Sequence, residues 1–144
     1  MGTTNWPRLL LCGLITGFVW TLLSATLLGL VGQDFVAAVP GRRLDAPGGL
    51  HLLMLGLNFA QAIWGIWFYT VLRPRYGPGK KTAALAGFAW WVVVSLQSAK
   101  WAALVAVPVK AAGALLLTTL PAIIVAMAVG AWAYERQKSG KLEG

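Results

Sequence analysis

The chain has 144 residues, of which 58% are apolar and only 11% are charged. Ordinary globular proteins carry roughly a quarter charged residues, so this composition excludes a water-soluble domain and predicts an integral membrane protein. The formal net charge of +8 is compatible with binding to nucleic acid or to anionic lipid, and the positions of the charges distinguish the two.

Four apolar segments follow one another along the chain, and each reaches the roughly 20 residues that a helix needs to cross a bilayer. They predict an all-α membrane protein, a four-transmembrane-helix bundle that forms a single transmembrane domain over residues 1–144. The predicted helices are 9–31, 49–72, 82–107 and 111–134, with an external loop at 32–48 and a cytoplasmic loop at 73–81.

The first predicted helix combines a small-residue step with one polar side chain, Ser24. Gly13 and Gly17 are spaced by four, which lets a neighbouring helix approach closely in a membrane. We interpret this step as packing within the bundle, with a homodimer contact as the alternative. Cys12 is the only cysteine, so the chain can form no internal disulfide.

The second predicted helix carries two amides. Asn58 and Gln61 are three residues apart and therefore share one face of the helix. An amide in hydrocarbon is costly unless it is hydrogen-bonded, and intramembrane polar residues are the usual clue to function. His51, the only histidine, lies at the outer start of this helix, and one histidine cannot supply the axial pair of a membrane haem unless a dimer brings two together.

A basic turn, RPRYGPGKK at 73–81, comes next. It follows no strand and lacks the Gly-Lys-Ser/Thr ending of a phosphate-binding loop. Pro74 is instead predicted to end the second helix, Gly77 and Gly79 to form the turn, and Thr82 to cap the third helix.

The third predicted helix places Gln97 and Lys100 on one face. We expect the Lys100 stem to lie along the helix and its ammonium to reach the outer interface, with Asp34 or Asp45 as a partner. A functional ligand is the alternative interpretation of this lysine.

Only a short stretch, VAVPVKAAG at 105–113, separates the third apolar segment from the fourth. Pro108 disfavours a continuous helix and Lys110 resists burial, so a tight hairpin is predicted there. Without it, 82–134 would form one helix of about 80 Å, too long for a membrane. The last two helices repeat the small-residue pattern at Ala83, Gly87, Ala122, Ala126 and Gly130.

The polar side chains of the four helices fall at similar depths, from near the midplane to about 8 Å outside it, given the rise of 1.5 Å per residue. This candidate polar layer comprises Asn58, Gln61, Gln97, Lys100, Ser24, Thr118 and Thr119. Hydrogen bonding between helices is one interpretation of the layer. A small polar pocket or vestibule open to the outside is the other.

Basic side chains gather on one side of the predicted membrane. The eight on that side are Arg8, Arg73, Arg75, Lys80, Lys81, Arg136, Lys138 and Lys141. Arg42, Arg43 and Lys110 lie on the other side, so the positive-inside rule predicts an antiparallel bundle with both termini cytoplasmic. This distribution favours anionic lipid headgroups over nucleic acid as the partner. The residues expected to contact headgroups are Arg73, Arg75, Lys80 and Lys81.

Aromatic side chains are expected at the cytoplasmic boundary, as in the interfacial belts of membrane proteins. The predicted belt comprises Trp6, Tyr69, Tyr76, Trp132 and Tyr134. Five tryptophans lie deeper than anchoring requires: Trp20, Trp64, Trp67, Trp90 and Trp91.

The sequence contains no recognisable reactive constellation. No Cys/His/Asp/Glu cluster has metal-ligand spacing, and no serine, histidine and carboxylate set indicates a hydrolase. No carboxylate lies within the predicted spans, because Glu135 falls at the inner boundary. We therefore expect a non-enzymatic protein without catalytic residues, metal or cofactor.

Two stretches, YTVLRPRYGPGKKTAALAGFAWW (69–91) and GAWAYE (130–135), resemble a group of small bacterial four-helix integral membrane proteins of unknown function. In that group a tryptophan-bearing second helix ends in an Arg-Pro-Arg-(Tyr/Phe)-Gly-Pro-Gly turn. The resemblance implies a multi-pass protein of the bacterial inner membrane and brings no catalytic residue, substrate or cofactor. The chain departs from the group at Pro121, where a polar or acidic residue is usual.

These observations lead to two functional expectations. The first is a structural or accessory membrane protein, as a homo-oligomer or as part of a larger membrane complex. The alternative is a small transporter, channel or lipophilic-ligand binder that uses the candidate polar layer.

Overall fold

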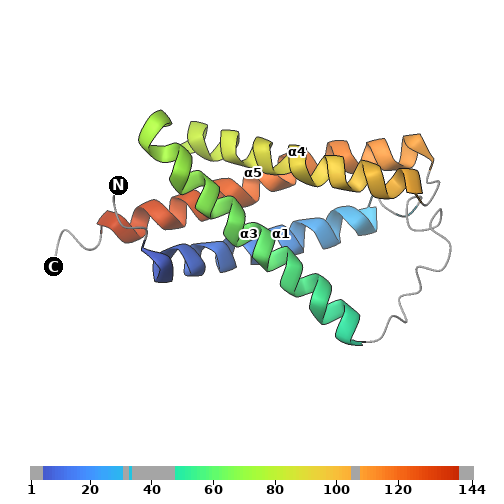
Figure 1. Cartoon of the computed structure of the whole chain (residues 1–144), viewed down its shortest axis with the longest axis horizontal. Helices are drawn as coiled ribbons and strands as arrows, with labels where there is room; N and C mark the ends of the chain where they lie inside the picture. The colour runs from blue at the N-terminus through green and yellow to red at the C-terminus, as the bar shows by residue number, and fades with distance from the viewer. Residues whose placement is uncertain (1–4, 31–32, 34–47, 105–107, 140–144) are drawn as a thin grey trace.

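The structure is a computed structural model that describes residues 5–30, 33, 48–104 and 108–139. The described residues form four helices and no strand, which confirms the all-α class and the number of helices (Figure 1). The helices are α1 (Trp6–Leu30), α3 (Gly48–Tyr76), α4 (Lys80–Leu104) and α5 (Val109–Ser139). Each contains a stretch long and apolar enough to cross a membrane. The predicted external loop lies outside the described residues except at its Gln33 and Gly48 positions.

The turn between α3 and α4 differs from its prediction at both edges. Helix α3 continues through Pro74 to Tyr76, because the helix is closed one turn later by Gly77, whose φ is 80°. The Gly77 amide donates to the Arg73 carbonyl at 2.9 Å, the left-handed cap that glycine forms without a Cβ penalty. Helix α4 then begins at Lys80, so Thr82 lies inside the helix rather than capping it. Its hydroxyl donates back to the Gly77 carbonyl at 2.7 Å.

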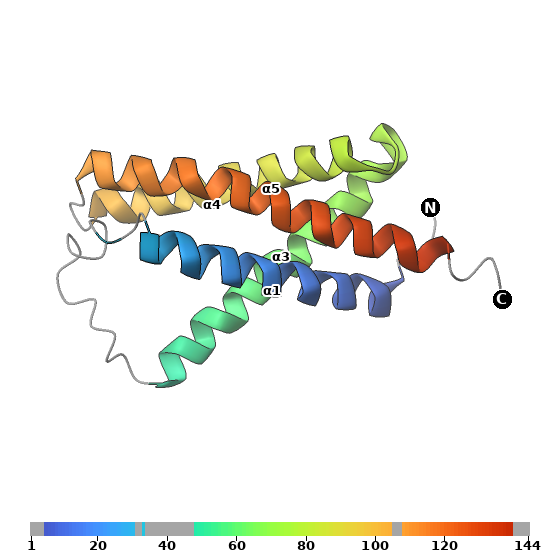
Figure 2. The same cartoon turned by 180° about the vertical axis from the view of Figure 1, so that it is seen from behind.

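The helices form a ring in which α1 and α4 each contact α3 and α5 and lie diagonally opposite one another (Figure 2). The first turn of α1, the ends of α3 and α5 and the start of α4 meet at one end, which we call the turn end. Contacts of Arg8 with Tyr134 and of Tyr69 with Glu135 and Gly79 hold these four helix termini together. Across the diagonal, the Trp20 and Trp90 rings lie 5.6 Å apart in the core.

The small-residue steps of the sequence pack inside the chain. A Cβ on Gly13 would lie 2.6 Å from the Ile63 Cγ1, and one on Gly17 would lie 2.5 Å from the Phe59 ring, so α1 and α3 touch at these two glycines. Gly130 is equally closed, because a Cβ there would overlap the Thr16 hydroxyl. These contacts support packing within the bundle as the role of the glycines.

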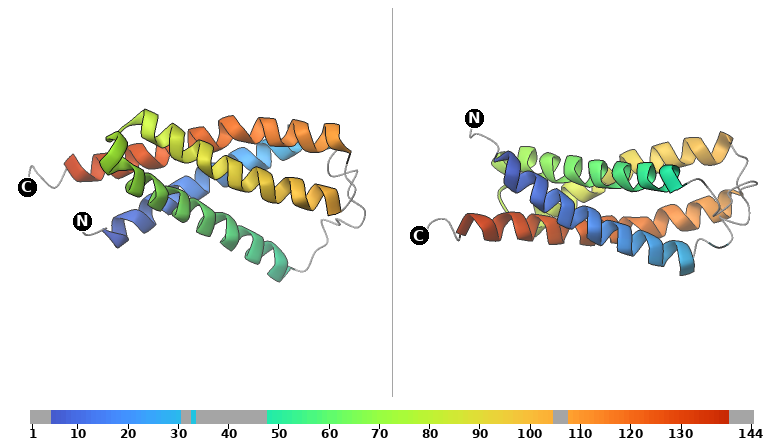
Figure 3. Two further views of the ribbon diagram at one scale, coloured as in Figure 1. Left: turned by 45° about the horizontal axis from the view of Figure 1, so that its top comes forward. Right: turned by 90° about the horizontal axis from the view of Figure 1, so that it is seen from below.

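Helix α3 crosses α1 obliquely, as close glycine-mediated crossings in membranes commonly do (Figures 1 and 2). Since the contact lies near the middle of α3, its first half runs away from the other helices, as the left view of Figure 3 also shows. Every side chain from Leu52 to Leu57 is exposed. Because this half diverges from α4, a cleft lies between the two helices.

Candidate functional site

A cleft of about 370 Å³ lies between α3 and α4. It is lined by Leu57, Ala60, Gln61 and Trp64 from α3 and by Trp90, Val93, Val94 and Gln97 from α4. Most of this lining is apolar, and the two glutamines are its only amides. Gln61 and Gln97, predicted from sequence to belong to one polar layer, therefore share one cleft.

The two glutamines lie at matching distances from the turn that joins their helices. Gln61 precedes the end of α3 at Tyr76 by 15 residues, and Gln97 follows the start of α4 at Lys80 by 17. At 1.5 Å per residue these separations are about 22 and 25 Å. Helices that run back from a common turn therefore present both amides at nearly one level.

Tryptophans form the floor and one wall of the cleft. Trp90 is only 1% exposed and packs on Trp20 below the cleft. Gly65 leaves room for the Trp90 ring, because a Cβ on Gly65 would lie 3.1 Å from that ring. Trp64 is 40% exposed, lines the cleft and stacks on Phe68 with the ring centroids 5.5 Å apart.

The chemistry of the lining selects the kind of molecule that fits. Each glutamine offers two N–H donors and a carbonyl acceptor, and no charged side chain lines the cleft. The Trp90 indole N–H is buried and has no hydrogen-bond partner within the described part of the chain. A volume within the usual range of roughly 300–1,000 Å³ for small-molecule sites, with few polar groups in an apolar wall, is typical of a ligand pocket.

The other members of the candidate layer do not join this cleft. Asn58 is half-buried outside the lining, and Lys100 is exposed. The hydroxyls of Thr118 and Thr119 donate to carbonyls of their own helix at 3.0 and 2.7 Å. The Ser24 hydroxyl is buried without a partner among the described residues. The predicted Lys100 partners, Asp34 and Asp45, lie outside the described residues.

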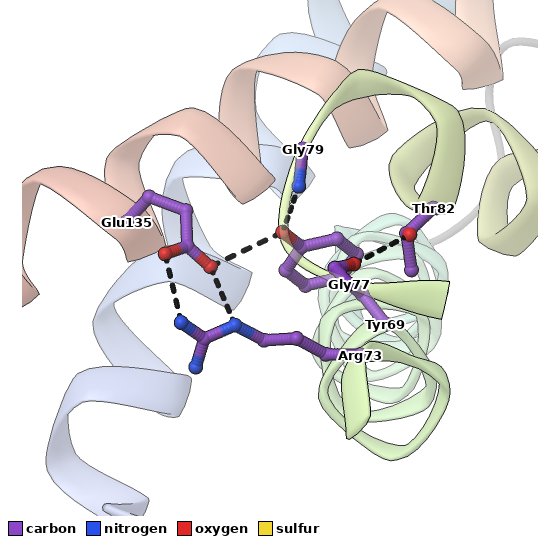
Figure 4. A network of polar contacts seen from close by, with 6 residues as sticks. All are labelled: Tyr69, Arg73, Gly77, Gly79, Thr82 and Glu135. Carbon is purple, nitrogen blue, oxygen red and sulfur yellow. Dashed lines mark hydrogen bonds and ion pairs between the residues drawn. The ribbon is translucent and has the colours of Figure 1, made fainter. Parts of the chain in front are cut away.

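A second polar cluster, which we call the turn-end network, joins α3, α4 and α5 (Figure 4). The Arg73 Nε lies 2.9 Å from the Glu135 Oε1, and the Arg73 Nη2 donates to Oε2 at 3.0 Å. The Tyr69 hydroxyl donates to Oε1 at 3.2 Å and accepts from the Gly79 amide at 3.3 Å. The Glu135 carboxylate thus connects the last turns of α3 and α5, and the Tyr69 hydroxyl extends the network to Gly79, the residue before α4.

The turn-end network changes the expected roles of two residues. Arg73, expected to contact headgroups, has Glu135 as a protein partner and is only 23% exposed. Tyr69, expected in the aromatic belt, is fully buried because its hydroxyl is bonded inside the bundle. The remaining residues expected at headgroups, Arg75, Lys80 and Lys81, are exposed.

Tyr134 also departs from the predicted belt. It is 8% exposed, lies edge-on to Tyr69 at 6.4 Å and carries the Arg8 guanidinium 4.2 Å above its ring. By contrast, Trp6, Tyr76 and Trp132 are more than half exposed, as belt residues are expected to be.

Sequence reasoning found the amides of the cleft but not its wall. Trp64 and Trp90 carried a signal, since they lie deeper than anchoring requires, but nothing in their spacing placed them opposite the glutamines. The turn-end network also had a signal, because Glu135 is the only acid at a boundary rich in arginine and lysine. Among the described residues, no group of three His, Cys, Asp or Glu side chains is placed to hold a metal ion.

Comparison with known proteins adds no family to this geometry, because no protein family, no curated protein and no solved structure matched the chain.

Proposed function

We propose that the protein is a multi-pass protein of the bacterial inner membrane, an antiparallel bundle with both termini in the cytoplasm. Four helices of spanning length support this placement, together with the basic residues at the turn end, which are Arg8, Arg73, Arg75, Lys80, Lys81 and Arg136. Exposed leucines, valines and phenylalanines around the bundle suit a lipid environment. The cleft then opens sideways toward the hydrocarbon.

Its function is the non-enzymatic binding of an uncharged lipophilic molecule in the cleft between α3 and α4. The observation that carries this proposal is the pair of amides, Gln61 and Gln97, on opposite walls of one apolar cleft. An exposed amide facing hydrocarbon is costly, and a ligand with a hydroxyl or carbonyl group relieves that cost. An ionised ligand is disfavoured because nothing in the lining would neutralise its charge.

Photolabelling with a diazirine-bearing long-chain alcohol tests the proposal directly. In the purified protein, the label is expected on peptides covering 57–64 and 90–97. Replacing both amides, Gln61→Leu with Gln97→Leu, removes the hydrogen-bonding partners and is expected to lower labelling about tenfold. Asn58→Leu is the matched control, because it removes an amide one turn away that does not line the cleft.

Labelling spread evenly over the exposed faces of all four helices would contradict the proposal. An equal loss of labelling in Asn58→Leu and in the double variant would contradict it too. A charged probe of the same length, a diazirine-bearing fatty acid, is expected to label the cleft less than the alcohol does.

An accessory or oligomer-forming role is the second candidate, and one observation favours it. The exposed apolar row Leu52–Leu57 continues from the mouth of the cleft along α3, so a helix of a second copy or of a partner could lie there. Native mass spectrometry from mild detergent separates the two roles. A stable oligomer that excludes the alcohol probe supports the accessory role, whereas a monomer that retains the probe supports ligand binding.

A further inference from the structure

A second groove, of about 230 Å³, lies at the turn end between the first turn of α4 and the last turns of α5. Its floor is made of three alanines, Ala83, Ala128 and Ala131. The rest of the lining is the fully buried Tyr69 and the more exposed Gly79, Lys80, Trp132 and Glu135, and these four form the mouth of the groove. The groove shares no lining residue with the cleft between α3 and α4.

The mouth brings together two opposite charges that do not neutralise each other. Glu135 forms its ion pair with Arg73, and within the described residues no ion pair joins it to Lys80. Tyr69 nevertheless keeps the two sides close, because its hydroxyl bonds both Glu135 and the amide of Gly79, the residue before Lys80. A ligand in this mouth meets a carboxylate on one side and an ammonium on the other.

Glu135 retains room for another donor. Its Oε1 receives the Tyr69 hydroxyl and faces the Arg73 Nε, whereas its Oε2 accepts only the Arg73 Nη2 (Figure 4). A carboxylate oxygen accepts two hydrogen bonds, so Oε2 has one place left. The Glu135 side chain is 29% exposed and lines the groove.

The groove also lies where a lipid headgroup would meet its chains. The spanning stretch of α4 begins at Lys80 and that of α5 ends at Arg136, so the charged mouth falls at the boundary and the alanines lie inside it. Trp132 at the mouth is 57% exposed, as interfacial tryptophans are. Alanine side chains leave a shallow apolar channel in which an acyl chain can lie.

We propose that this groove binds a phospholipid whose headgroup carries a protonated amine next to its phosphate. The ammonium donates to the Glu135 Oε2, the phosphate pairs with Lys80, and the first part of one acyl chain lies on Ala83, Ala128 and Ala131. A purely anionic headgroup fits less well, because it places its negative charge against Glu135 without an ammonium to offset it.

Native mass spectrometry of the full chain, titrated with defined lipids, tests the proposal. Phosphatidylethanolamine is expected to bind about tenfold more tightly than phosphatidylglycerol of the same chains, since only its headgroup offers a positively charged donor to the Glu135 carboxylate. Lys80→Gln is expected to weaken phosphatidylethanolamine binding about tenfold. Lys81→Gln, the neighbouring exposed lysine outside the groove, makes the same charge change and is expected to leave binding unchanged.

Two further arms identify the parts of the lipid that are recognised. Ala128→Leu fills the channel and is expected to weaken binding of the lipid while Lys80 and Glu135 remain. Glycerophosphoethanolamine, the headgroup without chains, is expected not to compete with the lipid at equal concentration, which separates a lipid site from a site for free phosphate.

Glu135→Gln is expected to abolish the preference for phosphatidylethanolamine over phosphatidylglycerol. Glu135→Gln also weakens the turn-end network. If this variant does not fold, the comparison of Lys80→Gln with Lys81→Gln decides the test. Equal binding of the two lipids to the unaltered protein, or equal losses in Lys80→Gln and Lys81→Gln, would overturn the proposal.

Discussion

Glu135 lies at the centre of the turn-end network. It joins Arg73 and Tyr69 of α3, and through the Tyr69 hydroxyl it reaches the Gly79 amide at the start of α4. Both members of the ion pair are less than one-third exposed, so water screens the pair only in part. The same carboxylate that organises the turn end also supplies an acceptor to the alanine-floored groove.

A double-mutant cycle measures the strength of this pair. We expect Arg73→Gln and Glu135→Gln to be coupled by about 1–3 kcal/mol in the free energy of unfolding, since each breaks a charge-assisted contact that is partly buried. Unfolding in detergent followed by tryptophan fluorescence gives the four values needed.

Arg75 provides the control for this cycle. It is exposed, lies over Tyr76 at 5.8 Å and has no carboxylate partner among the described residues. Its coupling to Glu135→Gln is expected to stay below about 0.5 kcal/mol, the usual limit for independent sites. A coupling as large as that of Arg73 would mean that the network acts through general charge rather than through its geometry.

At the scale of the elements, the crossing of α1 and α3 decides where the cleft lies. Gly13 and Gly17 let the two helices touch near the middle of α3, and the oblique crossing carries its first half away from α4. Gly65 performs a similar role on the other side, since it seats Trp90 at the floor of the cleft. Three glycines therefore shape the site without lining it.

Gly13→Ala is expected to destabilise the protein by about 1–3 kcal/mol, the usual cost of overpacking a close contact. The new Cβ would lie 2.8 Å from the Ile63 Cα, so relief requires the backbones of α1 and α3 to separate. Thermal unfolding in detergent, read as the loss of folded protein after heating, measures the effect.

Gly29→Ala is the matched control in the same helix, because nothing lies within 4 Å of the added Cβ. Its expected change is within about 0.5 kcal/mol, as for an exposed surface substitution. Equal destabilisation by the two variants would contradict the role of Gly13 as the crossing point.

At the scale of the whole molecule, the four helix termini at the turn end explain how charge and topology are related. Arg8, Arg75, Lys80, Lys81 and Arg136 come from all four helices and gather at one end of the bundle. Lys110 lies at the start of α5, beyond the end of α4 and away from that cluster. This uneven distribution of basic residues between the two ends is the basis of the proposed orientation in the membrane.

Cysteine labelling tests the orientation. In a Cys12→Ala background, Lys81→Cys and Lys110→Cys place single thiols at exposed positions on the two ends. In intact cells, a membrane-impermeant maleimide is expected to label Lys110→Cys at once and Lys81→Cys only after permeabilisation. The background without cysteine shows the unspecific signal, and the reverse labelling order would overturn the proposed topology.

The amino-acid sequence by itself determined the class and the elements of this protein. Composition predicted a membrane environment, apolar length predicted four helices, and the alternation of basic loops predicted the orientation. These features depend on the length, hydropathy and charge of contiguous segments, so no long-range contact is needed to predict them. Asn58, Gln61, Gln97 and Lys100 could likewise be selected as polar side chains at similar depths in the outer half of the bundle.

Only the tertiary structure decided which of these residues meet. Helical spacing gives the face of a residue relative to its own helix, but the rotation of each helix against its neighbours depends on packing. Gly13 and Gly17 set that packing, so Gln61 and Gln97 share the cleft while Asn58 and Lys100 do not. In the same way Arg73, one of four similar cations near the turn, is the one whose side chain reaches Glu135, because the ends of α3 and α5 lie side by side.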